Sequence, residues 1–200
     1  MALGHGLAPQ PPKDEARKIT FPDTEEYLTL VFDPHTHSVY SDGHVWPKIR
    51  VGEAVRDGLD AMAITEHLEY QPHIADLPHK DRNRSFEEAA GAARYSEVLI
   101  IPGAEITRKA PASHMNAIFI NDANKLYHVP NSAELNSSSG FRDAASKWPA
   151  QKAVNAANKQ GAFVFWNHSW WASDFPNGIP VLSDFHKKNI RKDPFYFTSM

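Results

Sequence analysis

The stretch that decides the fold of this 200-residue chain spans residues 33–43 and reads DPHTHSVYSDG. It follows the strand-like run TLVFD (29–33), so His35 and His37 stand at the end of a predicted strand. Side chains two apart on a strand share a face, which puts both imidazoles on one side. Two neutral imidazoles suit a divalent metal, and a Ser-Asp-Gly turn can return Asp42 to the same end. Taken alone, the H-x-H pair is equally typical of ordinary surface histidines.

Short apolar runs alternate with helical patterns along the rest of the chain. Pro residues open two of the helices, Gly residues end them, and a Ser-x-x-Glu pair resembles a capping box. The predicted elements are a helix from Pro47 to near Gly58, strand 61–65, a helix from Ser85 (with Glu88) to about Ser96, strands 98–106 and 115–120, a helix from Pro149 to Gly161, and strand 163–166. The run Ser137–Ser139 is interpreted as a loop. This alternation predicts an α/β domain with mostly parallel strands.

Three more of these strands end in residues that can bind metal. Thr65-Glu66-His67 follows an apolar strand, Glu105 closes another, and His168 comes directly after the last. Ligands in α/β sheets bind beyond the carboxyl ends of the strands, so these side chains are expected at the rim that holds His35 and His37. His67 could instead cap a strand–loop junction, and Glu105 could pair with a nearby Arg or Lys.

His114 begins a strand rather than ending one. If strands 98–106 and 115–120 form a hairpin, His114 lies at the end where Glu105 sits. If the two strands run parallel, His114 lies at the opposite end.

Composition excludes several classes of protein. Hydrophobic residues make up 42% and charged residues 22%, which is ordinary for a globular protein. The formal net charge of -3 gives no strong nucleic-acid signal. The absence of Cys excludes disulfides, thiolate zinc sites and cysteine nucleophiles. No apolar run approaches 18 residues and no intact signal peptide is visible, so no membrane span is expected. Neither the compartment nor the oligomeric state follows from the sequence.

In this order the motifs resemble the PHP family, the polymerase and histidinol phosphatase superfamily of metal-dependent hydrolases, and bacterial phosphoesterase-like members in particular. The matching features are D-x-H-x-H-S-x-x-S-D-G (33–43), T-E-H (65–67), G-A-E (103–105), His114 and N-H-S (167–169), within about residues 25–190. The resemblance implies a distorted (β/α)7-type, TIM-barrel-like barrel with two or three divalent ions at its rim, Zn, Mn or Fe.

The resemblance also implies residue roles. One metal would use His35, His37 and Glu105, a second would share Glu105 and take His114 and His168, and a third would use Asp42 and His67. Glu105 and Asp42 would thereby be catalytic. Asp33 and Glu66 are expected to orient ligand imidazoles. Arg108 could clamp a substrate phosphate, although an exposed loop arginine is the plainer interpretation.

The C-terminal part departs from the family pattern, which ends with a late D-x-H motif. Asp184-Phe185-His186 is the one D-x-H found there. It either supplies the missing ligands from a short last strand or lies on an exposed helix away from the rim. The adjacent lysines favour the helix, so Asp184 and His186 are not placed among the predicted ligands. The expected organisation is a flexible tail (1–18) and a PHP domain (19–200) that lacks the usual last strands.

The predicted function is hydrolysis of a phosphoester in a small-molecule substrate by a metal-activated water. Two alternatives stay open. The same centre could cleave an amide or a cyclic ester, or the short chain could bind metal without activity.

Overall fold

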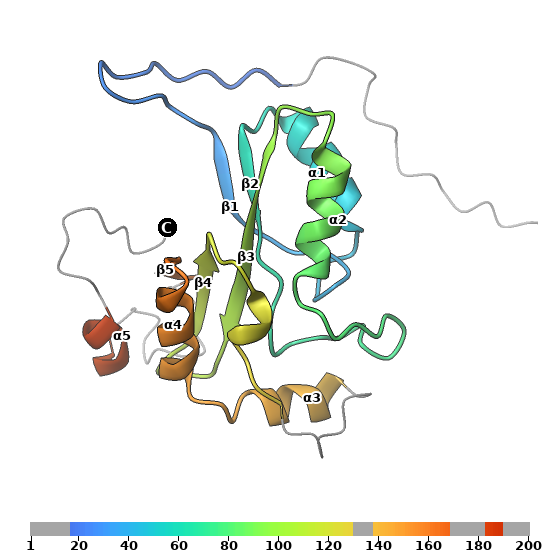
Figure 1. Ribbon diagram of the computed structural model, residues 1–200, viewed down its shortest axis with the longest axis vertical. Coiled ribbons are helices and arrows are strands. Elements are labelled where there is room, and N and C mark those ends of the chain that lie inside the picture. Colours follow the sequence, from blue (N-terminus) through green and yellow to red (C-terminus); the bar gives the residue numbers. More distant parts are fainter. Residues whose placement is uncertain (1–16, 130–137, 169–182, 190–200) are drawn as a thin grey trace, which may run out of the picture.

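The computed structural model describes residues 17–129, 138–168 and 183–189. Within them a five-stranded sheet has the order β1-β2-β3-β4-β5, so strands adjacent in sequence are adjacent in space (Figure 1). The strands are β1 (Phe32–Thr36), β2 (Ala61–Ile64), β3 (Leu99–Thr107), β4 (His114–Ile118) and β5 (Phe163–Trp166). The helices are α1 (Pro47–Asp57), α2 (Arg84–Ala93), α3 (Ser138–Ala145), α4 (Ala150–Lys159), α5 (Asp184–Asn189) and the short 3-10 helix η1 (Ala123–Lys125).

Strand directions explain how the rim is assembled. β1, β2 and β3 pair in parallel, whereas β4 is antiparallel to both of its neighbours. β5 therefore runs in the direction of β3, and four of the five strands finish at one edge. This agrees with the predicted mostly parallel sheet. The hairpin expected between β3 and β4 is also present, with Thr107 opposite His114.

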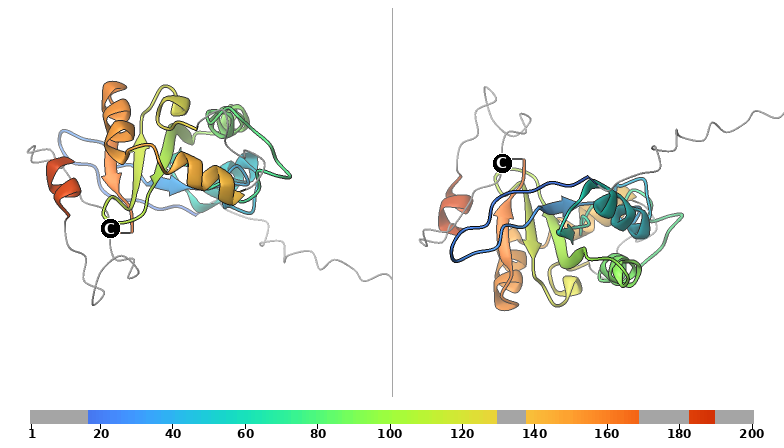
Figure 2. Two further views of the ribbon diagram at one scale, coloured as in Figure 1. Left: turned by 90° about the horizontal axis from the view of Figure 1, so that it is seen from below. Right: turned by 90° about the horizontal axis from the view of Figure 1, so that it is seen from above.

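Helices cover one face of the curled sheet. α1 and α2 lie beside β1–β3, and α4 lies beside β4 and β5 (Figures 1 and 2). Alternation along the strands sends Met62, Ile64 and Ile100 to the α1–α2 side, and Ala61, Ala63 and Ile101 to the other. That second face carries only a small apolar cluster. The sheet is the curled half of a barrel, as expected for an incomplete (β/α)7-type fold.

Several predicted boundaries shift. β1 begins at Phe32 rather than Thr29. The capping box at Ser85 and Glu88 is wrong, because Asn83 is the N-cap residue and Ser85 is a buried residue within α2. By contrast, Gly58 ends α1 as predicted, with a φ of 72° that suits glycine.

The segment after residue 137 holds a helix that the sequence did not predict. Ser138 and Ser139 belong to α3 and not to a loop. α3 has only two buried apolar positions, Phe141 and Ala145, too few to give a clear helical pattern. The predicted tail lies outside the described residues except for Arg17 and Lys18.

The D-x-H segment Asp184–His186 forms part of helix α5, which is the alternative that the adjacent lysines favoured. Asp184 is fully exposed in α5. His186 was expected to be exposed and is instead buried, because its ring stacks on Trp166 with the centroids 4.0 Å apart. Its Nε2 lies 3.2 Å from the Ala112 carbonyl oxygen and its Nδ1 lies 2.9 Å from Ser183 Oγ.

Candidate metal centre

Glu105 is the centre of the rim. It lies on β3 on the same face as Ile101 and Gly103, opposite the face packed by helices. Its side chain is fully buried, yet five imidazoles surround it. They come from the ends of β1 and β2, the start of β4 and the end of β5: His35, His37, His67, His114 and His168.

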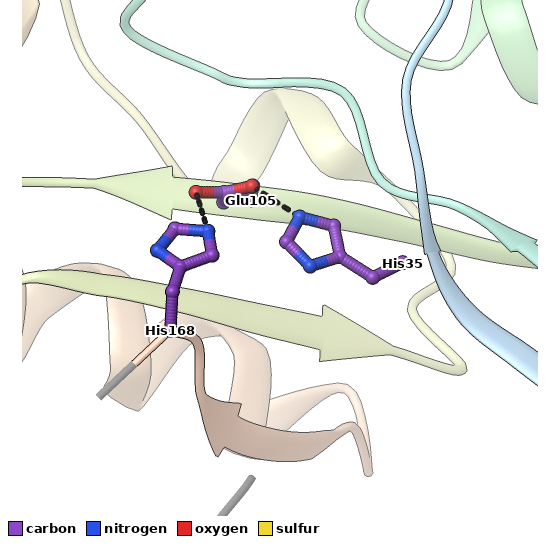
Figure 3. A group of neighbouring side chains, drawn as sticks. All are labelled: His35, Glu105 and His168. Carbon is purple, nitrogen blue, oxygen red and sulfur yellow. Dashed lines mark hydrogen bonds and ion pairs between the residues drawn. The ribbon is translucent and has the colours of Figure 1, made fainter. Parts of the chain in front are cut away.

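The two carboxylate oxygens of Glu105 face different imidazoles. Oε2 lies 2.7 Å from His35 Nε2 and 3.1 Å from His37 Nε2. Oε1 lies 2.6 Å from His114 Nδ1, 3.4 Å from His67 Nδ1 and 4.0 Å from His168 Nε2. Figure 3 shows His35 and His168 approaching the two oxygens from separate strands. The carboxylate therefore lies between two groups of imidazoles.

Asp42 reaches the same cluster through a tight turn. Its carboxylate oxygens lie 3.7 Å from His37 Nδ1 and 3.5 Å from His67 Nε2. The turn closes with Gly43 N–H donating to the Ser38 carbonyl at 2.9 Å. A Cβ at Gly43 would stand 2.6 Å from the His37 carbonyl oxygen, so only glycine permits this approach.

A buried carboxylate beneath the cluster orients His37. Glu66 accepts hydrogen bonds from Ser38 N–H and from the hydroxyls of Ser38 and Ser41, the last at 2.5 Å. Ser41 Oγ also lies 3.2 Å from His37 Nδ1. Since the Ser41 hydroxyl donates to Glu66, it is an acceptor toward His37, and this places the ring proton on Nδ1. When the ring is neutral, His37 Nε2 presents its lone pair toward Glu105; when the ring is protonated, Nε2 donates to Glu105.

His67 and Asp33 have supporting contacts of their own. Thr107 Oγ1 lies 2.6 Å from His67 Nδ1. Asp33 accepts a hydrogen bond from the His35 backbone N–H at 3.0 Å, so it supports the backbone of β1 rather than the imidazole.

The electrostatics favour ionised Glu105 and Asp42 carboxylates beside a neutral His168. Burial alone would raise the pKa of Glu105, but hydrogen bonds from His114, His35 and His37 hold it well below its usual value. The hydrogen bond from His67 lowers the pKa of Asp42 to about 2, against a smaller effect of burial. Burial opposes protonation of His37, yet Glu105 raises its pKa. Burial lowers the pKa of His168 to about 4, and the neighbouring imidazoles add to this.

This donor set fits a divalent cation. The Nε2 atoms of His35 and His37 are 2.9 Å apart, and both face one carboxylate oxygen. Two ring nitrogens at this distance cannot both carry a proton. Such separations are close to the roughly 3.3 Å between ligand atoms around a tetrahedral ion. Two groups of possible ligand atoms share Glu105: one adds His35 and His168, the other adds His37 and His67.

These groups differ from the sets implied by family resemblance, which paired His35 with His37 and His114 with His168. His114 contacts Glu105 at 2.6 Å without belonging to either group. The other six predicted ligands nevertheless all lie around the Glu105 carboxylate, five as its direct neighbours and Asp42 next to His37 and His67. The division of ligands among ions stays a prediction.

Arg108 is not the exposed loop arginine of the plainer interpretation. It is buried and forms an ion pair with Glu69, which is also fully buried. Burial raises the pKa of Glu69 to about 6, and Arg108 limits the rise. Arg108 also donates to the carbonyl oxygens of Thr107 and Trp148, at 2.9 and 3.2 Å. No sequence pattern indicated this pair, since Glu69 and Arg108 are far apart in the chain.

The cluster opens into a cavity of about 1120 Å³. Six of the seven predicted ligands line it, all except the buried Glu105. The rest of the lining is Tyr70, Thr107, Arg108, Lys109, Arg142, Asp143, Ser146 and Lys147. A ligand can therefore reach the imidazoles from this cavity.

The fold and the site define an α/β protein with a histidine–carboxylate centre at the carboxyl edge of its parallel strands. The PHP domain family model matches residues 33–161, so the chain belongs to the PHP family. None of the curated proteins matches it.

The similar solved structures include two phosphoesterase-like proteins by prediction. A two-domain protein from Bacteroides vulgatus, which contains a PHP-like metal-dependent phosphoesterase by prediction, is 40% identical with a TM-score of 0.73. The match covers 88% of this chain and 45% of that one, so the chain spans less than half of that relative. A candidate metal-dependent phosphoesterase from Bifidobacterium adolescentis is 17% identical, with a TM-score of 0.52 and coverage of 80% and 73%. This second likeness supports the fold alone. None of the helices within the described residues has the length and apolar character that a membrane crossing requires.

Proposed function

We propose that this protein is a metal-dependent hydrolase that cleaves a phosphoester of a small molecule. The observation that carries the proposal is the buried Glu105 carboxylate, which is placed between imidazoles that converge from four strands and face an open cavity. Glu105 and Asp42 together can balance at most two cationic imidazoles, so at least three of the five imidazoles are neutral and present lone pairs. Neutral imidazoles around an ionised carboxylate are ligands for a divalent cation.

The residues that would hold the ions are His35, His37, Asp42, His67, Glu105, His114 and His168. Zn, Mn or Fe, two or three ions per chain, would suit this set. When bound, such ions lower the pKa of a water toward neutrality and neutralise charge on phosphate oxygens.

The protein's own contribution is to keep the ligands in one protonation state and orientation. Glu66 acts through Ser41 to hold the His37 proton on Nδ1. Thr107 holds His67 in place through Nδ1. Arg108 lines the cavity and adds positive charge near the rim, although Glu69 takes part of its hydrogen-bonding capacity.

The test is a metal-content measurement combined with a substrate panel. Protein supplemented with zinc or manganese is analysed for bound metal and assayed on phosphomonoesters, phosphodiesters, cyclic esters and amides. We expect more than one ion per chain and metal-dependent release of phosphate. If the protein binds stoichiometric metal but hydrolyses only amides, the phosphoester is the wrong substrate class and an amide replaces it. If no metal is bound, the proposal is overturned.

A further inference from the structure

α3 has two distinct faces. Phe141 and Ala145, four residues apart, are buried against Ile74, Tyr127 and Val129. Four polar residues at the same helical spacing, in the helix and the turn after it, line the cavity: Arg142, Asp143, Ser146 and Lys147. The helix thus turns an apolar face to the protein and a polar stripe to the cavity.

The stripe is held in place relative to the metal centre. Arg82 is buried and its guanidinium lies 4.9 Å from the centroid of the Phe141 ring, so the inner face of α3 packs on a fixed cation. Arg108 Nε donates to the carbonyl oxygen of Trp148, just after the helix, at 3.2 Å. Arg108 directly follows β3, which carries Glu105. In Figure 1, α3 lies at the end of the sheet where β3 finishes.

Away from the imidazole cluster, the cavity wall carries mostly positive charge. Arg108, Lys109, Arg142 and Lys147 line it, and Asp143 is the one carboxylate among the described residues there. Asp143 pairs weakly with Arg142, at 3.7 Å on the exposed surface. The Arg108 side chain is only 6% exposed, yet within the described residues its Nη2 has no hydrogen-bond partner.

A buried guanidinium nitrogen at the cavity wall that no acceptor occupies can donate to an anionic group of a ligand. We propose, building on the proposed function, that the substrate has two anionic groups. One is the scissile phosphate at the imidazole cluster. The other is a second phosphate or a carboxylate, which binds the wall formed by Arg142, Lys147 and Lys109, with Arg108 between the two groups.

The test uses non-hydrolysable probes. α,ω-Alkane bisphosphonates of two to six methylene groups are compared with alkyl monophosphonates of the same length, by calorimetric titration of the metal-loaded protein. The metal content is measured again after each titration, since bisphosphonates can extract ions. We expect the best bisphosphonate to bind at least about tenfold more tightly than its monophosphonate.

Variants assign the preference to α3. Arg142→Gln/Lys147→Gln should reduce bisphosphonate affinity about tenfold and leave monophosphonate affinity unchanged, since two exposed charges are lost. Arg142→Lys/Lys147→Arg should keep the preference. Asp143→Asn should strengthen bisphosphonate binding. Lys152→Gln/Lys159→Gln, an equal change of charge on α4 outside the cavity, serves as the control.

The inference is overturned if the wild type shows no bisphosphonate preference, or if the preference survives the Gln double variant. The proposed function is judged separately by phosphate release. If the wild type hydrolyses simple phosphoesters but shows no preference for bisphosphonates, only the inference of a second anion-binding wall is contradicted. A preference that depends on Arg142 and Lys147 in a protein without hydrolysis contradicts only the proposed function.

Discussion

Ser41→Ala should weaken metal binding by breaking the contact that orients His37. The Ser41 hydroxyl donates to Glu66 at 2.5 Å and lies 3.2 Å from His37 Nδ1, so its loss frees the imidazole to change tautomer or rotate. Removing a partner of a ligating imidazole typically costs 10- to 100-fold in metal affinity, or about 1.4–2.7 kcal/mol. Ser41 is 1% exposed, so loss of its hydrogen bond should also cost about 1–2 kcal/mol of unfolding free energy.

Ser38→Ala is the matched control. Ser38 is equally buried and its hydroxyl also donates to Glu66; within the described residues that hydroxyl contacts no imidazole and instead accepts from the Tyr40 backbone N–H at 3.2 Å. Both variants should lose a similar unfolding free energy in urea titrations of the metal-free protein. Only Ser41→Ala should lose metal affinity in competition with a chromogenic chelator. Equal losses of affinity in the two variants would refute the orienting role.

Three further predictions concern charge and pH. Glu105→Gln should reduce metal content and activity more than any single His→Ala substitution, since Glu105 alone contacts both groups of imidazoles. If metal content and activity are kept in Glu105→Gln but lost in His114→Ala, Glu105 is not the ligand that the two groups share. Metal affinity should fall as the pH drops from 8 to 6, because Glu105 raises the pKa of His37 and a protonated imidazole cannot bind metal. Asp42, with a pKa of about 2, stays ionised over this range. Competition with a chelator at each pH measures the affinity, and an affinity that does not change with pH would contradict the prediction. Burial lowers the pKa of His79 to about 4, so its neutral form stabilises the fold above pH 6.5, and this contribution is lost as the pH falls through 4. The metal-free His79→Gln variant should therefore lose less unfolding free energy than the metal-free wild type when the pH is lowered. Parallel profiles of unfolding free energy against pH would contradict this prediction.

The sequence predicted the histidines at the rim of the sheet better than the residues that pack around them. His35 lies near the end of β1, and His67 and His168 follow β2 and β5. These three strands run in the same direction, and strand ends are visible in an apolar pattern. His114 required the hairpin hypothesis, which the β3–β4 register confirms.

The features that were missed depend on long-range contacts. The Glu69–Arg108 pair forms between residues on different segments, so neither residue alone indicates that it is buried. His186 looked exposed beside two lysines, but Trp166 covers its ring. α3 is defined by its packing on Tyr127 and Ile74, which its own short sequence does not reveal.

The pairing of His35 and His168 around Glu105 has a consequence for folding. These two histidines come from the first and last strands of the described sheet, and an ion held between them would close a loop that contains most of the chain. Such an ion would act as a reversible cross-link, comparable to a disulfide in a chain that has no cysteine. His114 and Glu105, on neighbouring strands of one hairpin, would come together early and locally. The outer histidines would meet last, so metal capture would complete the fold as well as the site.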